Sequence, residues 1–267
     1  MAGSLRLYWE IALRAFQRQL AYRTANVAGL VTNCCFGYLR AVVFLAVYQG
    51  RTLVAGYDLP DVITYMWVTQ ALLMVVALWG WWDVEETIRT GDVIADLAKP
   101  FSFTGFWLAR DCGRAIYFLI FRGVPIFLVG QLTFGVRWPQ YPVTWLLFGA
   151  SVALGVLVSF AWRFMLNLSA FWSTDARGLG NLLNTVVTLL SGLVLPLPYF
   201  PDSIRAILLV LPFAGWMQTP ADVFLERLAG PALALALGQQ VLWAAVMLVA
   251  AQLLLTAAVR KVVVQGG

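Results

Sequence analysis

The sequence contains no histidine and few charged residues. Histidine is the commonest general acid or base and metal ligand near neutral pH, so its absence argues against His-based catalysis and His-ligated metal sites. Charged residues make up 12% of the chain, against roughly a quarter in a soluble domain, and hydrophobic residues make up 61%. Such a chain lacks the polar surface that water requires, and we expect an integral membrane protein.

Cysteine, lysine and clustered acids are also scarce. Three cysteines, two of them adjacent, indicate no disulfide framework, and Asp92 with Asp96 has no further acids beside it, so we expect no metal site. The net charge of +5 comes from scattered arginines, which disfavours a nucleic-acid partner. Neither Lys99 nor Lys261 belongs to a phosphate-binding Gly-rich loop, so we expect no ATP hydrolysis and no cofactor in this chain, which is therefore not an enzyme by itself.

Long apolar runs are plentiful. Runs of about 20 residues predict membrane-spanning helices, because β-barrel strands are shorter and alternate in polarity. The fold class we expect is all-α integral membrane, with residues 1–267 as a single transmembrane domain. Six spans are predicted, at residues 26–48, 60–82, 106–134, 143–172, 180–199 and 233–258.

The cationic residues favour one orientation. With the N-terminus inside, eleven lie on the cytoplasmic side: Arg6, Arg14, Arg18, Arg23, Arg89, Lys99, Arg110, Arg114, Arg177, Arg260 and Lys261. Four lie outside: Arg51, Arg137, Arg205 and Arg227. This excess predicts that both termini are cytoplasmic.

Two segments outside the predicted spans have their own patterns. Residues 4–23 read as an amphipathic helix with Ser4 as its N-cap, either lying in the cytoplasmic interface, which we favour, or packed on the side of the bundle. Residues 196–231 hold six of the eleven prolines, and their apolar pieces are too short to span. We expect short re-entrant helices there, with an ordinary extracellular loop as the alternative.

Residues 83–100 form a charged stretch between two predicted spans. Gly91 is expected to end one short helix, Asp92 to cap the next, and Pro100 to stop it. A short capped helix on a cytoplasmic loop suits the groove of a soluble partner. The alternative is a solvated loop that only connects two spans.

This stretch, together with Ala109–Ala115 and the opening Leu7-Tyr8-Trp9-Glu10, resembles permease subunits of ABC-2 type transporters. The resemblance implies six spans, an N-terminal connecting helix, a coupling helix between spans two and three, and re-entrant helices before span six. It also implies that the coupling element docks on a separate ATP-hydrolysing subunit, which binds the ATP and Mg. The residues that carry this role by resemblance are Glu85, Arg89, Gly91, Asp92, Val93, Asp96, Lys99 and Pro100.

Charged residues also occur within the predicted spans, where they are costly and tend to face a bundle interior or a water-filled path. Asp111 and Arg122 are eleven residues apart, about 20° around an ideal helix, so one face is expected to carry both. Arg40, Asp111, Arg114 and Arg122 are candidates for a translocation path or subunit interface. A structural ion pair is the alternative that we favour for Asp111 and Arg114. Snorkelling is a further alternative for Arg40 and Arg163, whose depth depends on where the spans end.

We therefore predict the permease subunit of an ATP-driven exporter in the bacterial cytoplasmic membrane, surrounded by membrane lipid. Its partners would be two copies of an ABC ATPase subunit and a second permease chain, identical or paralogous. An amphipathic small molecule, a lipid-like compound or a peptide would be moved outward. The alternatives are an ATP-independent six-span channel or ion-coupled carrier, and a membrane enzyme. The lack of symmetry between the two halves disfavours the carrier, and the missing acid constellation disfavours the enzyme.

Overall fold

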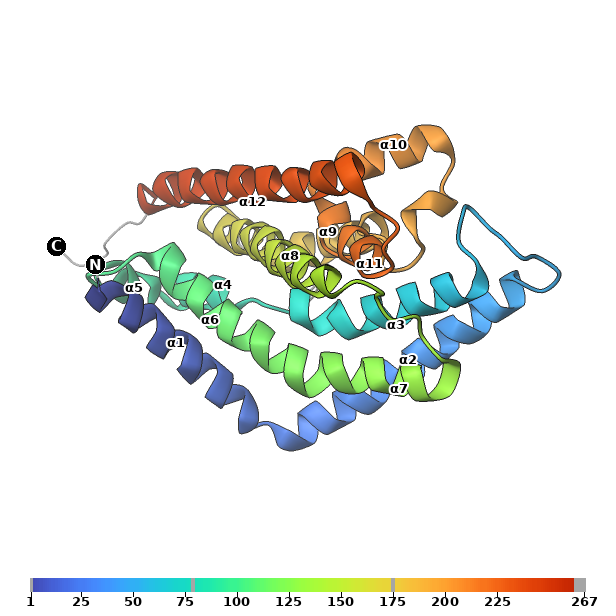
Figure 1. Ribbon diagram of the computed structural model, residues 1–267. Coiled ribbons are helices and arrows are strands. Elements are labelled where there is room, and N and C mark those ends of the chain that lie inside the picture. The colour runs from blue at the N-terminus through green and yellow to red at the C-terminus, as the bar shows by residue number, and fades with distance from the viewer. Residues whose placement is uncertain (1, 78–79, 174–175, 262–267) are drawn as a thin grey trace.

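The computed structural model describes residues 2–77, 80–173 and 176–261. Within these ranges, five helical segments are long and apolar enough to cross a membrane. They are α2 (Arg23–Val47), α3 (Leu59–Val76), the continuous α6–η1–α7 (Phe103–Phe118, Leu119–Gly123 and Val124–Phe134), α8 (Pro142–Leu168) and α12 (Gly230–Val259). All five run along the long axis of the molecule, and α1 begins at the same end as α12 finishes (Figure 1).

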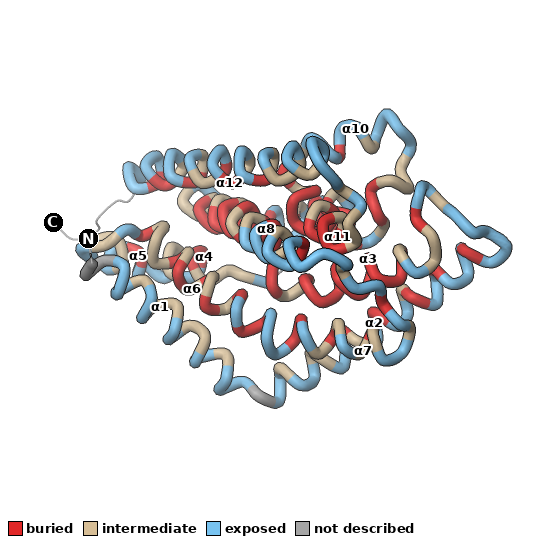
Figure 2. The backbone as a smooth tube through the Cα atoms, in the orientation of Figure 1, coloured by how far each residue is buried: buried red, intermediate tan, exposed pale blue. Residues whose placement is uncertain are grey.

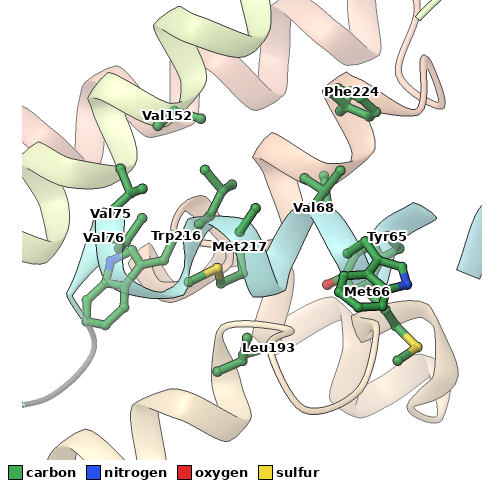
Figure 3. Close-up of a cluster of buried hydrophobic side chains, with 14 of the residues drawn as sticks. Tyr65, Met66, Val68, Val75, Val76, Val152, Leu193, Trp216, Met217 and Phe224 are labelled. Carbon is green, nitrogen blue, oxygen red and sulfur yellow. The ribbon is translucent and has the colours of Figure 1, made fainter. Parts of the chain in front are cut away.

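Helix α3 is the centre of the bundle. In its most apolar window 72% of the residues are buried, against 22% in α2 and 28% in α12, and the contrast is visible in Figure 2. Val68 and Val75 of α3 belong to one apolar cluster with Val152 of α8 and with Trp216 and Met217, which precede α11 (Figure 3). The outer helices keep apolar side chains exposed, as a bundle surrounded by lipid requires.

The predicted second span is shorter than expected. Helix α3 ends at Val76 and Ala77 follows in the left-handed conformation, so Trp81 and Trp82 lie outside the helix; residues 78–79 are outside the described ranges. Side chains of α6 and α8 bind the last carbonyls of α3. Arg114 donates to the Met74 and Val75 carbonyls at 2.6 and 2.9 Å, and Ser159 donates to the Val76 carbonyl at 2.6 Å. These bonds satisfy acceptors that a helix end leaves open.

Helix α1 (Ala2–Leu20) packs on the flank of the bundle, beside α6 (Figure 1). It begins before Ser4, so Ser4 is inside the helix and the prediction of an N-cap there was wrong. A Cβ atom added at Gly113 of α6 would lie 2.0 Å from the Ala12 carbonyl oxygen, which shows how closely the two backbones approach. One side of α1 is therefore packed on the bundle, while Leu5 and Trp9 stay exposed. A position of this helix in the cytoplasmic interface stays a prediction.

The predicted fifth span is only partly helical. Helix α9 (Ala176–Leu190) has 15 residues, about 22 Å of helix, against a hydrocarbon core of about 30 Å. The chain nevertheless runs between the two ends of the bundle: Arg177 pairs with Glu85 at one end, and the hydroxyls of Tyr199 and Tyr48 lie 2.6 Å apart at the other. A sixth span thus stays a prediction, with a helix that breaks at Gly192.

The proline-rich segment 196–231 forms short helices, as expected. They are η3 (Leu197–Tyr199), α10 (Asp202–Val210), η4 (Pro212–Gly215) and α11 (Gln218–Phe224). Helix α11 is buried against α3 and α8, and Trp216 and Met217 just before it are fully buried. A buried helix of seven residues is not an ordinary loop, and protein covers its backbone as a position within a membrane would require.

We expect Gly113→Ala to destabilise the protein by about 1–3 kcal/mol, because the new methyl group would collide with the α1 backbone. Gly149→Ala is the matched control, since Gly149 is also helical and a Cβ there meets nothing within 4 Å. Thermal unfolding of the detergent-solubilised protein measures the difference. Equal unfolding midpoints for the two variants would contradict the close α1–α6 contact.

Candidate functional site

The predicted coupling segment consists of two short helices, α4 (Asp83–Thr90) and α5 (Val93–Leu97). Gly91 between them has φ 85°, and its N–H donates to the Ile88 carbonyl, so it ends α4 as predicted. The prediction that the Asp92 side chain caps α5 was wrong. Asp92 is in the right-handed helical region, and its carboxylate instead accepts a 2.8 Å hydrogen bond from the Thr90 hydroxyl.

One face of the segment is buried in the bundle. Val84 of α4 and Val93 of α5 are 0% and 3% exposed, in an apolar cluster with Trp107 of α6 and with Phe160 and Phe164 of α8. Val93 was a candidate for docking a partner, but this burial turns it toward the protein's own core. Burying both valines fixes the position of α4 and α5 relative to α6 and α8.

Glu85 also points inward. Its side chain is 5% exposed, and its carboxylate lies 2.6 Å from the guanidinium of Arg177, in the first turn of α9. The guanidinium of Arg89 lies 4.0 Å from the same carboxylate. The Glu85 backbone N–H donates to the Asn167 side-chain oxygen of α8 at 2.9 Å. Glu85 is thus a residue that attaches α4 to α8 and α9, rather than one exposed to a partner.

The other predicted docking residues lie on the outer face of the segment. Arg89, Gly91, Asp92, Lys99 and Pro100 are exposed. Asp96 is half-buried and pairs with Lys99 at 2.6 Å. Two further exposed residues on this face, Glu86 and Ile94, were outside the predicted set. The face therefore combines charges of both signs with the exposed side chain of Ile94, a composition that suits a protein partner.

A buried polar network continues from the segment into the spans. Asn167 donates to the Trp81 carbonyl at 3.0 Å, and to the carbonyl of Arg163 one turn earlier in α8. Arg163 is 2% exposed and donates two hydrogen bonds to the Asp111 carboxylate of α6, at 2.8 and 3.1 Å. Arg163 therefore does not snorkel, because its guanidinium is held in a two-pronged ion pair inside the protein.

Asp111 has a second cationic partner. Arg114, one turn along α6, donates to it at 2.8 Å and also holds the end of α3 through the Met74 and Val75 carbonyls. One fully buried carboxylate thus joins α6, α8 and α3. The favoured alternative for Asp111 and Arg114, a structural ion pair, agrees with this geometry, and a role in a path stays untested.

Arg122 faces a different neighbour from Asp111. The five-residue π-helical turn Leu119–Gly123 changes the angular register of the helix, so the expected single polar face is absent. The Arg122 guanidinium lies over Phe118 at 5.2 Å and packs against Gly29 of α2, with the Ala25 and Asn26 carbonyls at 3.5 Å. Arg122 is thus a contact between the π-helical turn η1 and the first half of α2.

Arg40 binds irregular backbone in the bundle interior. It donates to the Gln70 side chain at 2.8 Å and to the carbonyl of Leu193, just after the break at Gly192. Tyr65 donates to the Gly192 carbonyl at 2.7 Å. Together they satisfy acceptors that a broken helix leaves open. Arg40 therefore does not snorkel, and any role in a path stays a prediction.

A second polar cluster lies at the opposite end of the bundle. Asp222 of α11 accepts hydrogen bonds of 2.7 Å from Tyr57 and from Gln218. Burial raises the pKa of Asp222, and these two hydrogen bonds offset part of the effect. Arg227 lies over the Tyr57 ring at 3.7 Å. The cluster attaches α11 to the connection between α2 and α3.

The family model described as ABC-2 family transporter protein matches residues 37–266, which is most of the chain. No curated protein matches. The match includes the coupling segment, all the residues of the buried Asp111 network, and the proline-rich segment.

We expect Asp111→Asn to destabilise the protein by about 3–5 kcal/mol, because it leaves two guanidinium groups without their buried counter-charge. Asp83→Asn is the matched control. Asp83 pairs with Arg110 at 3.0 Å, but its side chain is 44% exposed, so its loss should cost less than about 1 kcal/mol. Thermal unfolding followed by tryptophan fluorescence measures both. Similar shifts would show that Asp111 is not the main junction.

Proposed function

The chain belongs to the ABC-2 family of transporter proteins, and from this membership we propose that it is the membrane-spanning permease subunit of an ATP-driven exporter. Permeases of this family generally pair with ABC ATPase subunits. Two permease chains, identical or paralogous, would form the path, and two ATPase subunits would bind ATP and Mg beneath them. The substrate class is an amphipathic small molecule, a lipid-like compound or a peptide, moved outward across the bacterial cytoplasmic membrane.

The observation that carries the proposal is the two-sided form of the coupling segment. Its outer face exposes Arg89, Asp92 and Ile94. Its inner face is fixed to the bundle by buried Val84 and Val93. A soluble partner bound to the outer face would therefore move α6 and α8 together with the segment, because the segment is packed on the ends of these two helices.

The buried polar network would transmit that movement to the spans. Glu85 is linked through Asn167 to α8, and Arg163 is linked through Asp111 to α6. Breaking a buried ion pair costs about 3–5 kcal/mol, so the segment and these helix ends are expected to move as one unit. A tilt imposed by ATP-driven closure of the ATPase subunits would thereby reach the spans and switch access between the two sides of the membrane.

Co-purification tests the docking face. With the ABC ATPase subunit co-expressed, we expect Asp92→Lys combined with Ile94→Glu to lower the amount of ATPase retained by about tenfold, which corresponds to the loss of one strong contact. The control is Asp202→Lys, at an exposed acid near the other end of the bundle. Retention that is unchanged by the double substitution, or ATP hydrolysis by the lone purified chain, would refute the proposal.

Glu85→Gln should leave the binding of the ATPase subunit intact and weaken the transmission of its movement to the spans. The ATPase should still be retained, because Glu85 is buried behind the docking face, but the loss of charge weakens the ion pair to Arg177. We expect an ATP-dependent change in labelling of Leu53→Cys, in a background without the native cysteines, to fall about fivefold, the effect of roughly 1 kcal/mol at a partly exposed pair. Glu86→Gln, the exposed neighbour, should leave it unchanged. Equal effects of the two changes would contradict a role for the inner face.

A further inference from the structure

A cavity of about 290 Å³ lies between α1, the end of α3 and the first half of α6. Its polar lining is Arg18 and Gln19 from α1, Asp83 from the start of α4, and Arg110, Asp111 and Arg114 from α6. Figure 1 shows α1 beside α6 along this stretch. The volume equals roughly ten water molecules at ~30 Å³ each, which leaves room for a small polar headgroup.

The cavity carries an excess of positive charge. Asp111 is already paired with Arg114 and Arg163, and Asp83 with Arg110. The side chain of Arg18 is exposed and has no ion-pair or hydrogen-bond partner among the described residues. Three arginines and two carboxylates line the cavity, and this excess of one positive charge favours the binding of an anion.

Of the three arginines that line the cavity, Arg18 and Arg110 have guanidinium N–H groups with which to bind a ligand. The Arg114 guanidinium is occupied by Asp111 and two carbonyls. Arg110 uses one nitrogen for Asp83, while its guanidinium lies 4.4 Å from the centre of the Trp107 ring, which limits where it can move. Arg18 and Arg110 also line an adjacent cavity together with Arg14 and one acid, Glu10. Arginine forks match the oxygens of a phosphate group.

The surroundings place the cavity at the membrane surface. It is also lined by Tyr22, in the turn between α1 and α2, and by Trp81. Tyrosine and tryptophan are typical of the headgroup level. Helix α2 begins immediately after the turn at Tyr22 and is 25 residues long, enough to cross the hydrocarbon core from that point. A ligand here would be at the depth of lipid phosphates.

We propose that this cavity binds the phosphate of an anionic membrane lipid through Arg18 and Arg110. Arg114 contributes charge without direct contact. The inference rests on the proposed function for the orientation that turns this end of the bundle toward the cytoplasmic leaflet. Since α1 and α6 form opposite walls, the bound lipid stabilises their contact at the base of the bundle.

Native mass spectrometry of the purified full-length chain in detergent tests this, with titrated phosphatidylglycerol as the probe. One lipid should bind more tightly than further copies. Arg18→Gln should weaken its binding about fivefold, the effect of one basic residue at a membrane surface, and Arg18→Glu should weaken it further. Arg260→Gln is the control, because the Arg260 side chain is also exposed, forms no ion pair with the residues that the structure describes, and lies outside the cavity. Phosphatidylcholine, which has no net charge, should bind wild type more weakly.

Equal loss from Arg18→Gln and Arg260→Gln, or loss from neither, would overturn the site. Binding of water-soluble glycerophosphoglycerol as tight as that of the lipid would show a free phosphate compound to be the occupant, and would overturn the lipid assignment. The assay contains no ATPase. Its failure is therefore distinct from failure of the proposed function, which would appear as unchanged ATPase co-purification when the docking face is altered.

Discussion

The half of this bundle that lies next to α4 and α5 depends on the pairing of one buried carboxylate with two arginines. Asp111 accepts from Arg163 of α8 and from Arg114 of α6, and Arg114 also binds the last turn of α3. A lone charge at this position would be prohibitive, and the pair is tolerable because nearly every donor and acceptor is satisfied. Three successive candidate spans, α3, α6–η1–α7 and α8, are thereby held in one arrangement.

The same constraint explains where the irregular backbone lies. Helix α3 stops at Val76 where Arg114 and Ser159 can bind its carbonyls, and the chain after α9 breaks at Gly192 where Arg40 and Tyr65 can. In an apolar surrounding, an open carbonyl without such a donor costs several kcal/mol, by order of magnitude. The arginines and hydroxyl groups inside the bundle therefore lie where helices end, and they bind the backbone carbonyls that are left open there.

Much of the fold could be predicted from apolar runs, and the positions of its charges could not. The start or end of most spans agrees within about three residues, because length and hydropathy determine them. The inward direction of Glu85 and Val93 depends on which helix covers α4, a long-range fact that no local pattern contains. The π-helical turn before Val124 likewise separates Arg122 from Asp111, although an ideal helix would align them. Asn167 and Arg163 carried a signal as polar residues in an apolar run, but not the identity of their partners.

The central position of α3 determines how a movement would pass through the bundle. The C-terminal end of α3 is bound by Arg114, and its N-terminal end follows Tyr57, which donates a hydrogen bond to Asp222 of α11. A packed helix with fixed polar contacts at both ends does not bend easily, because its buried side chains have no free volume into which to move. A displacement at the coupling segment must therefore either shift α3 as a whole or break one of the two polar clusters. The first keeps the buried ion pairs intact, whose separation would cost about 3–5 kcal/mol, and it would link α4 and α5 to the short helices at the opposite end of the bundle.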